Sequence, residues 1–243
     1  FLILKLCFYA GLLLASRLFF VKSDELCDGT WADADCWSPS GVPSSSDNVT
    51  IAHNIVVGSN QSCNDLATTN PSFITKTLTV KSGAVLSVGG DVINDGGLIL
   101  GSGGTVGTMN ITGNLDNDNT IEINSGSTMI LSSSSTMLAG GSLVINSSSS
   151  SFGSLVMPGT FSIDNVWSFE YGRYVNSVAG GWDLISSPVS GLQISTFIDS
   201  NSDIATNGTD PTQYAVGVYT NTAAASAAGN EWQNYTSSSV GST

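Results

Sequence analysis

Carboxylates are the main side chains capable of acid–base or metal chemistry in this 243-residue chain, which has 19 Asp and Glu but six Lys and Arg. The run Asp116–Asn119 (DNDN) places oxygen ligands at alternate positions, as a Ca²⁺-binding loop does. It lacks the spaced glycine and the distal glutamate of such a loop, and Asp and Asn also suit tight turns. We therefore expect no cofactor and keep Asp116 and Asp118 as weak calcium candidates.

No catalytic residue set is recognisable. His53 is the only histidine, and the chain has no G-x-S-x-G motif around a nucleophilic serine. A pair of carboxylates is enough to hydrolyse a glycosidic bond, but enzymes that cleave acidic polysaccharides on a β-solenoid generally also need Lys or Arg to hold the substrate. After residue 21 only four cations occur, namely Lys22, Lys76, Lys81 and Arg173. We predict no catalytic residues and expect that the protein is not an enzyme.

The overall charge excludes one class of partner. The chain carries a net charge of −13, whereas a protein that binds nucleic acid needs a basic face to neutralise phosphates. We therefore expect no nucleic-acid partner.

Residues 1–23 are predicted to be a secretory signal peptide or an uncleaved membrane anchor. Phe1–Val21 is apolar except for Lys5 and Arg17. Lys5 followed by the apolar stretch Leu6–Ser16 fits a signal peptide, whereas an anchor requires about 20 apolar residues. Export follows from either reading, and a membrane is contacted only if this segment stays uncleaved.

Three cysteines follow this segment, and export permits disulfides. Cys27 and Cys36 would close a small loop (CDGTWADADC). Pairing of Cys36 with Cys63 remains open as the alternative, because three thiols leave one over.

Tryptophans provide the candidate ligand contacts. Exposed at the surface, Trp31, Trp37 and Trp182 would offer rings on which a sugar can stack. In the competing interpretation, Trp31 and Trp37 cap the open end of the fold and bury its first coil. We favour the cap for these two residues.

The pattern after residue 47 is one of short strands separated by Gly, Asn, Asp and Ser, without helical periodicity. It is also a degenerate repeat: GDVINDGGLIL at Gly90–Leu100 matches GNLDNDNTIEI at Gly113–Ile123, and LTVKSGAVLSV at Leu78–Val88 matches IEINSGSTMIL at Ile121–Leu131. The predicted strands are Asn48–Ala52, Asn54–Val57, Thr77–Val80, Val85–Val88, Leu98–Leu100, Thr108–Ile111, Ile121–Ile123, Met129–Leu131, Leu143–Ile145 and Leu155–Met157.

The repeat is about 20–23 residues long, and a repeat of this length built from short strands is typical of one coil of a β-solenoid. We predict an all-β protein with an N-terminal cap at residues 24–47, a right-handed parallel β-solenoid (β-helix) at residues 48–165 and a truncated, partial β-sandwich-like module at residues 166–243. Asn94 and Asn117 should stack as an amide ladder in successive coils.

The module has its own strands. Trp182–Ser186, Tyr214–Tyr219 and Trp232–Tyr235 are the predicted strands of this part, where aromatic residues cluster.

Several segments resemble one group of proteins. Thr30–Val57 (TWADADCWSPSGVPSSSDNVTIAHNIVV) resembles the opening of large secreted surface proteins of Bacteroidetes, and Leu78–Val88 resembles their coils. Gly181–Gly191 (GWDLISSPVSG) resembles a β module that follows those coils. The resemblance implies export by type IX secretion, a location at the extracellular cell surface and an adhesin-like role.

These observations predict an exported structural or adhesive segment of a larger cell-surface protein. Its expected partner is a cell-surface or extracellular polysaccharide. The alternative function is that of a polysaccharide-degrading enzyme, a lyase or a glycoside hydrolase, built on the same β-helix scaffold.

Overall fold

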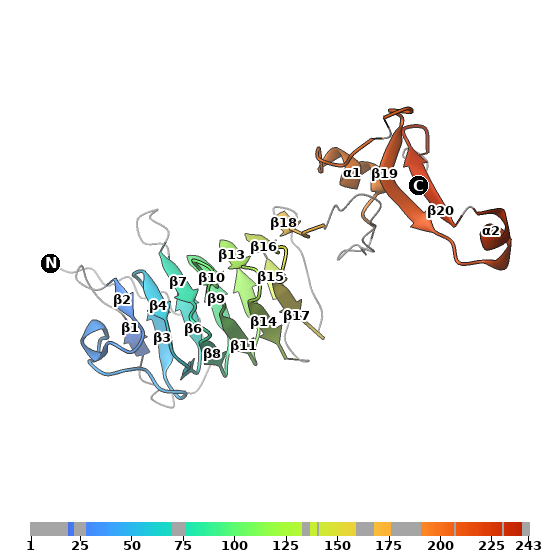
Figure 1. Ribbon diagram of the computed structural model, residues 1–243. Coiled ribbons are helices and arrows are strands. Elements are labelled where there is room, and N and C mark those ends of the chain that lie inside the picture. The colour runs from blue at the N-terminus through green and yellow to red at the C-terminus, as the bar shows by residue number, and fades with distance from the viewer. Residues whose placement is uncertain are drawn as a thin grey trace. The chain divides into compact units, whose positions relative to one another are not determined.

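The computed structural model describes residues 19–21, 28–69, 76–132, 137–139, 141–158, 168–175, 191–206, 208–229 and 231–239. The chain divides into two compact units, Phe1–Asp183 and Leu184–Thr243. Figure 1 shows the strands of the first unit stacked side by side as parallel arrows. Each unit is considered by itself below.

The first unit is a three-sided parallel β-solenoid, as predicted. The chain passes from sheet A to sheet B to sheet C and returns to sheet A one strand further along, and neighbouring strands in each sheet are parallel. Sheet A contains β1 (Phe19–Val21), β3 (Asn48–Ile51), β6 (Leu66–Thr68), β9 (Val92–Asn94), β12 (Leu115–Asn117) and β15 (Met137–Ala139). Sheet B contains β2 (Gly29–Thr30), β4 (Ile55–Val57), β7 (Thr77–Val80), β10 (Gly97–Leu100), β13 (Thr120–Ile123), β16 (Ser142–Ile145) and β18 (Ser168–Tyr171). Sheet C contains β5 (Gln61–Cys63), β8 (Val85–Val88), β11 (Thr108–Ile111), β14 (Thr128–Leu131) and β17 (Ser154–Val156).

The register confirms the repeat that the sequence predicts. Leu98 of β10 lies beside Leu78 of β7 on one side and Ile121 of β13 on the other. Asn94 of β9 lies beside Asn117 of β12. The matched sequence segments therefore occupy equivalent places in successive coils.

Alternation along each strand creates the core. In β7, β13 and β16 the second and fourth residues point inward and are buried, because successive side chains of a strand face opposite sides of the sheet. Stacking the coils turns these positions into continuous aliphatic columns. One column that runs through sheet B includes the fully buried residues Leu78, Leu98, Ile121 and Leu143.

A polar ladder runs through the same interior. Thr68 Oγ1 donates to Asn94 Oδ1 over 2.6 Å, and Asn94 Nδ2 donates to Asn117 Oδ1 over 2.7 Å. Asn117 Nδ2 in turn donates to the main-chain oxygen of Ser142 over 3.2 Å. The ladder satisfies amides that are completely buried, where an unpaired polar group would be costly.

Turns at the corners need glycine because neighbouring coils approach closely. A Cβ atom added to Gly107 would lie 2.0 Å from the main-chain oxygen of Val80 in the preceding coil. At Gly141 the corresponding distance, to the main-chain oxygen of Asn119, would be 1.9 Å. Both positions therefore exclude every other residue type unless the backbone moves.

The predicted cap is also present. Trp31 and Trp37 are 1% and 4% exposed and belong to the same core cluster as the coils. Their rings meet edge to face with centroids 5.2 Å apart, and Trp37 Nε1 donates to the main-chain oxygen of Trp31 over 2.9 Å. A short 3-10 helix, Ala34–Cys36, joins them.

The ten strands predicted between residues 48 and 157 all occur, each within one residue at either end. Five further strands were not predicted: β5, β6, β9, β12 and β15. Each has three residues, which is too short for alternation to stand out from the polar turns around it.

The N-terminal segment contributes one described strand. Phe19–Val21, part of the predicted signal peptide or anchor, forms β1 and pairs in parallel with β3. In the part of the chain that the structure describes, no helix is long and apolar enough to cross a membrane.

Two boundaries differ from the prediction. Strand β18 (Ser168–Tyr171) pairs with β16, so the solenoid extends beyond residue 165. The two units divide between Asp183 and Leu184, rather than at residue 166.

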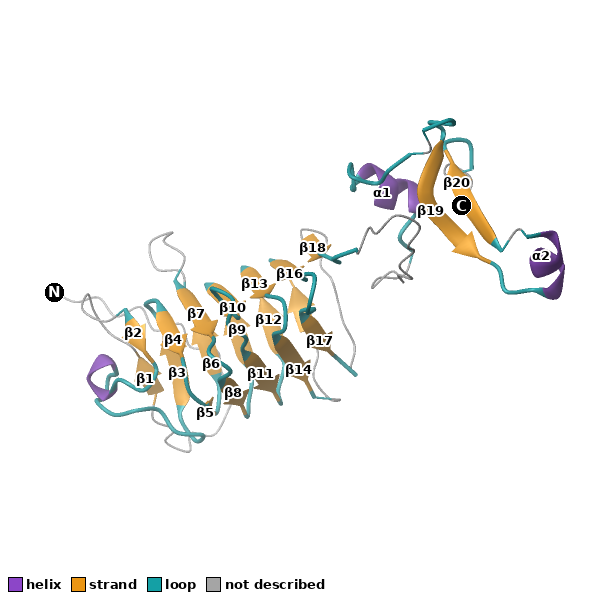
Figure 2. Cartoon of the chain, in the orientation of Figure 1, coloured by secondary structure: helices purple, strands orange, loops and turns teal. Residues whose placement is uncertain are grey.

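The second unit contains an antiparallel pair and two short helices, drawn in orange and purple in Figure 2. Strands β19 (Gln213–Tyr219) and β20 (Trp232–Thr236) match the predicted strands. The predicted strand Trp182–Ser186 lies outside the described residues. The helices α1 (Ile194–Asp199) and α2 (Ala223–Ala228) were not predicted, since six residues make fewer than two turns and show no periodicity.

We predict that Ile121→Ala lowers the free energy of unfolding by about 2–5 kcal/mol, because it opens a cavity in an interior column. Ile130→Ala is the matched control: Ile121 is 0% exposed, whereas Ile130 points outward from β14 and is 38% exposed. Urea denaturation measures both values. Equal losses in the two variants would contradict the column.

Asn117→Ala should cost about 1–3 kcal/mol of unfolding free energy, because Asn94 loses a partner in a fully buried site. Asn110→Ala is the control, since Asn110 points outward from β11, and about 0.5 kcal/mol or less is expected. The same denaturation assay applies. If Asn117→Ala is as mild as its control, the ladder does not stabilise the fold.

Candidate functional site

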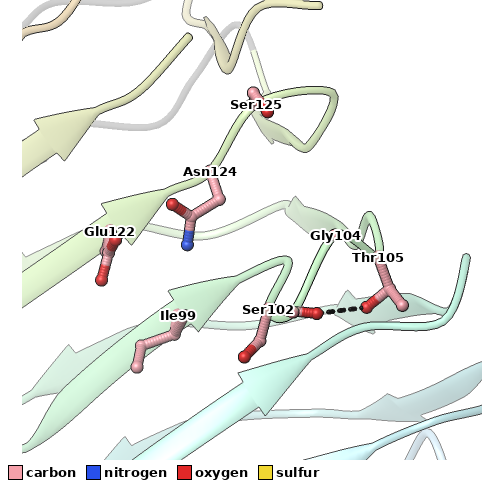
Figure 3. A pocket seen from close by; sticks show the side chains of 8 residues that line it. Ile99, Ser102, Gly104, Thr105, Glu122, Asn124 and Ser125 are labelled. Carbon is pink, nitrogen blue, oxygen red and sulfur yellow. Dashed lines mark hydrogen bonds between the residues drawn. The ribbon is translucent and has the colours of Figure 1, made fainter. Parts of the chain in front are cut away.

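A hollow of about 300 Å³ opens on the outer face of sheet B, beside the loop between β10 and β11. Figure 3 shows Ile99, Glu122 and Asn124 extending from neighbouring strand ends toward the same side. The loop forms the other wall. The lining residues are Ile99, Ser102, Gly103, Gly104, Thr105, Glu122, Asn124 and Ser125.

The hollow exists because one coil has a longer turn than its neighbours. Seven residues, 101–107, separate β10 from β11. Four residues separate β7 from β8 and four separate β13 from β14. Insertions in a solenoid repeat emerge as surface loops, so these extra residues stand out beside the two four-residue turns on either side.

The loop is a small hairpin with a defined turn. Ser102 and Thr105 form an antiparallel bridge with two main-chain hydrogen bonds of 3.1 Å, and Thr105 Oγ1 donates to the main-chain oxygen of Ser102 over 2.8 Å. Gly103 and Gly104 have φ values of 59° and 78°. Two consecutive positive φ values are what a type I′ hairpin turn requires, and Gly-Gly supplies them.

An amide pair fixes the polar wall opposite the loop. Asn146 Nδ2 donates to Glu122 Oε1 over 3.1 Å and to Asn124 Oδ1 over 3.0 Å. Asn124 Nδ2 donates to the main-chain oxygen of Gly101 over 2.9 Å. The Glu122 carboxylate is thereby held in place. Because a carboxylate offers about four acceptor positions in all, Glu122 can still accept hydrogen bonds from a ligand.

The chemistry of the hollow suits recognition better than catalysis. Hydroxyl, amide and carboxylate groups surround one apolar side chain, Ile99, as in sites that orient a ligand by hydrogen bonds. Among the residues that line the hollow, Glu122 is the one ionisable side chain. Glycoside hydrolysis by the usual mechanism needs two carboxyl groups flanking the bond.

Sequence reasoning did not identify this hollow. The signal was present, because Gly-Gly flanked by Ser and Thr indicates a hairpin turn. The register of the coils was also needed, since Glu122 and Ile99 are 23 positions apart in sequence but are partners in adjacent strands.

The tryptophan prediction is corrected in part. Trp31 and Trp37 are buried in the core, so their rings are covered by protein and do not form a platform for a sugar. Trp182 lies outside the described residues, and its role stays a prediction.

The calcium candidates Asp116 and Asp118 lie near the beginning of β13, whereas Glu122 of the hollow lies near the end of that strand. Asp116 points outward from β12, and Asp118 is exposed in the turn before β13. Partial burial raises the pKa of Asp116, with smaller contributions from the charges of Asp118 and Asp95. Burial and then Asp118 likewise raise the pKa of Asp95. In the described ranges, no group of three acidic, histidine or cysteine side chains is arranged to hold a metal ion.

The cysteine alternatives are narrowed. Cys63 is a free, buried thiol, so the alternative pairing of Cys36 with Cys63 is wrong. Burial, followed by the charge of Asp65, raises the pKa of Cys63 to about 12. Cys27 lies outside the described residues, and its pairing with Cys36 stays a prediction.

No protein-family model matches this chain, and neither a curated protein nor a solved structure matches it. The interpretation of the site therefore rests on its own geometry.

We predict that Asp118→Asn raises the free energy of unfolding at pH 7 by about 0.2–1 kcal/mol, the range for exposed charge pairs at a protein surface. Folded-state pKa values of Asp95 and Asp116 lie above 3.8. Their repulsion is therefore absent below that pH and grows as the pH rises through the folded values. The gain should vanish near pH 3.8, which urea denaturation across pH 3.5–7.5 measures.

Asp91→Asn is a control for the loss of one charge, since Asp91 lies at another corner and accepts a hydrogen bond from the main chain of Asn114. A destabilised Asp118→Asn protein would contradict the repulsion. A Ca²⁺-dependent rise in melting temperature that Asp118→Asn abolishes would instead identify Asp116 and Asp118 as calcium ligands.

Proposed function

We propose that this chain is an exported structural or adhesive segment of a larger cell-surface protein, and that it contacts carbohydrate. The resemblance of Thr30–Val57 and Leu78–Val88 to secreted surface proteins of Bacteroidetes supports the export and the surface location. Pairing of Cys27 with Cys36 is part of this proposal, because an oxidising compartment permits it.

The observation that carries the proposal is the regular stack of strands. Sheets of six, seven and five parallel strands form the three sides. At about 4.8 Å per strand, the seven-stranded side extends over roughly 29 Å. Such a body supports a spacer or an extended contact surface, as repeat proteins commonly do.

The outer face of sheet C suits contact with an uncharged polymer. Its central column runs in register through the outward-facing residues Ser62, Ser87, Asn110, Ile130 and Val156. No member of this column is charged, although the whole chain carries −13. Covering the column therefore removes no charge from water, a step that would be costly.

The hollow beside Glu122 adds a defined contact. Ser102, Thr105 and Asn124 offer donors and acceptors around the apolar Ile99, and a sugar presents hydroxyl groups around an apolar ring. A carboxylate that accepts a hydrogen bond from a sugar hydroxyl forms a charge-assisted bond, stronger than a neutral one.

One observation favours the rival function, a polysaccharide-degrading enzyme. The raised pKa values of Asp95 and Asp116 are a property that acid catalysts share. Asp95 and Asp116 lie near the turn that precedes β13, whereas Glu122 and Asn124 lie at the end of β13. The raised values follow from partial burial and mutual repulsion, which a structural corner produces as well.

A glycan array combined with an assay for released reducing sugar separates the two functions. We predict binding without turnover, and an affinity at least about tenfold lower for Glu122→Ala, because a hydrogen bond to a charged group is lost. Glu170→Ala is the matched control, since Glu170 points outward from β18 in the same column as Glu122. It should bind within about twofold of the wild type.

Two results would contradict this function. Turnover that Asp116→Asn abolishes would establish the enzyme, and the absence of binding to every glycan would remove the carbohydrate contact. Equal affinities of the Glu122 and Glu170 variants would place the contact outside the hollow.

A further inference from the structure

The second unit presents two aromatic rings at its surface. Tyr219 of β19 and Trp232 of β20 are partners across the antiparallel pair. Their ring centroids lie 4.8 Å apart with the planes tilted by 51°. The two residues are 51% and 37% exposed, in contrast to the buried Trp31 and Trp37 of the solenoid.

The contact between Tyr219 and Trp232 stabilises the antiparallel strands but does not cover both rings. Cross-strand aromatic pairs stabilise a hairpin beyond the contribution of the area that they bury. Covering the two rings completely would stabilise the unit further, because it would remove apolar surface from water. A large part of both rings nevertheless faces solvent.

No side chain projects from β19 at Gly217, beside the two rings. Gly217 lies two residues before Tyr219, so both face the same side of β19. A Cβ atom on Gly217 would lie 2.6 Å from the main-chain oxygen of Gln233, which excludes a larger residue there. The partner of Gly217 across the pair is Asn234, two residues after Trp232. A flat ring laid over Tyr219 and Trp232 therefore meets no tall side chain at Gly217.

Asn234 supplies a polar edge with a fixed orientation. Its Nδ2 donates to the main-chain oxygen of Tyr214 over 2.7 Å. An amide whose nitrogen is held in this way keeps its oxygen as an acceptor in a defined place. Asn234 lies two residues after Trp232 and therefore on the same side of β20 as that ring.

The charge of the second unit restricts what these rings can hold. From Leu184 to Thr243 the sequence contains no Lys, Arg or His but contains Asp199, Asp203, Asp210 and Glu231. Glu231 immediately precedes Trp232. An anionic ligand would be repelled without a compensating cation, so the rings suit an uncharged ligand with an apolar face and hydroxyl groups better than an acidic one.

We propose that Tyr219 and Trp232 form a stacking platform for a pyranose ring of a neutral polysaccharide, with Asn234 accepting a hydrogen bond from a hydroxyl. The C–H face of the sugar lies on the aromatic rings. This site is separate from the hollow beside Glu122, and it rests on the proposed function only for its choice of carbohydrate as the ligand.

Affinity electrophoresis of the full chain tests the platform, in gels that contain hydroxyethyl cellulose, galactomannan or polygalacturonate. We expect retardation by at least one of the two neutral polymers and none by polygalacturonate. Trp232→Ala and Tyr219→Ala should each lower the affinity at least about fivefold, because each removes one ring on which the sugar stacks.

Conservative variants separate stacking from folding. Trp232→Phe and Tyr219→Phe retain a ring and should bind within about threefold of the wild type. Tyr174→Ala removes an equally exposed tyrosine from the solenoid unit and should bind like the wild type. Trp232→Ala should lower the affinity by the same factor whether or not Glu122→Ala is also present, because the two sites are separate.

Three outcomes would overturn the platform. Retardation of the alanine variants equal to that of the wild type would place the sugar elsewhere and leave the proposed function standing. Retardation by polygalacturonate alone would contradict the charge argument. Binding to no neutral polymer here, together with an empty glycan array, would remove both the platform and the carbohydrate contact of the proposed function.

Discussion

In-register stacking of inward-facing side chains is the constraint on which the solenoid depends. Adjacent parallel strands lie only about 4.8 Å apart, so each interior residue touches its counterpart in the coils before and after it. Leu78, Leu98 and Ile121 meet this requirement as aliphatic residues of similar volume. Polar residues inside the solenoid are satisfied by neighbouring coils, since Asn94 donates to Asn117 and the buried Ser127 hydroxyl accepts from the main-chain nitrogen of Gly107.

The corners follow from the same constraint. When strands are stacked this closely, the turns between them are stacked as well, and main-chain atoms of neighbouring coils come into contact. Gly107 and Gly141 have no space for a Cβ atom. At other corners a side chain of one coil caps the next, since Asp65 Oδ1 accepts from the main-chain nitrogen of Asp91 and Asp91 Oδ1 from that of Asn114. The same stacking brings Asp95, Asp116 and Asp118 together, where their charges repel one another. The outer faces carry no such requirement, and the hollow arises where one turn is longer than its neighbours.

The columns were predictable from the sequence, whereas the surface sites were not. Matching Leu78–Val88 with Ile121–Leu131 predicted which residues stack, because periodic aliphatic positions report directly on burial. The short strands of sheet A were missed because three residues such as Leu115–Asn117 carry too little pattern. Asn117 was nevertheless placed correctly, since its repeat partner Asn94 identified the ladder. For Trp31 and Trp37 the sequence favoured burial in a cap without excluding exposure, and the packing shows that both are buried. Glu122 and Ile99, and likewise Tyr219 and Trp232, become neighbours through strand pairing, which composition and spacing do not reveal.

A cross-linking measurement tests the stacking register most directly. Ile99 and Glu122 are Cα partners on the outer face of sheet B. The strand spacing of about 4.8 Å falls within the range that a disulfide spans. The double variant Ile99→Cys and Glu122→Cys should therefore oxidise to an intrachain disulfide, as detected by peptide mass spectrometry. Moving the second cysteine by two positions, to Thr120, should greatly reduce the yield, and the buried Cys63 thiol, whose pKa is raised to about 12, should stay reduced. Efficient cross-linking of Ile99→Cys to Thr120→Cys in preference to Glu122→Cys would contradict the register and, with it, the columns and the ladder.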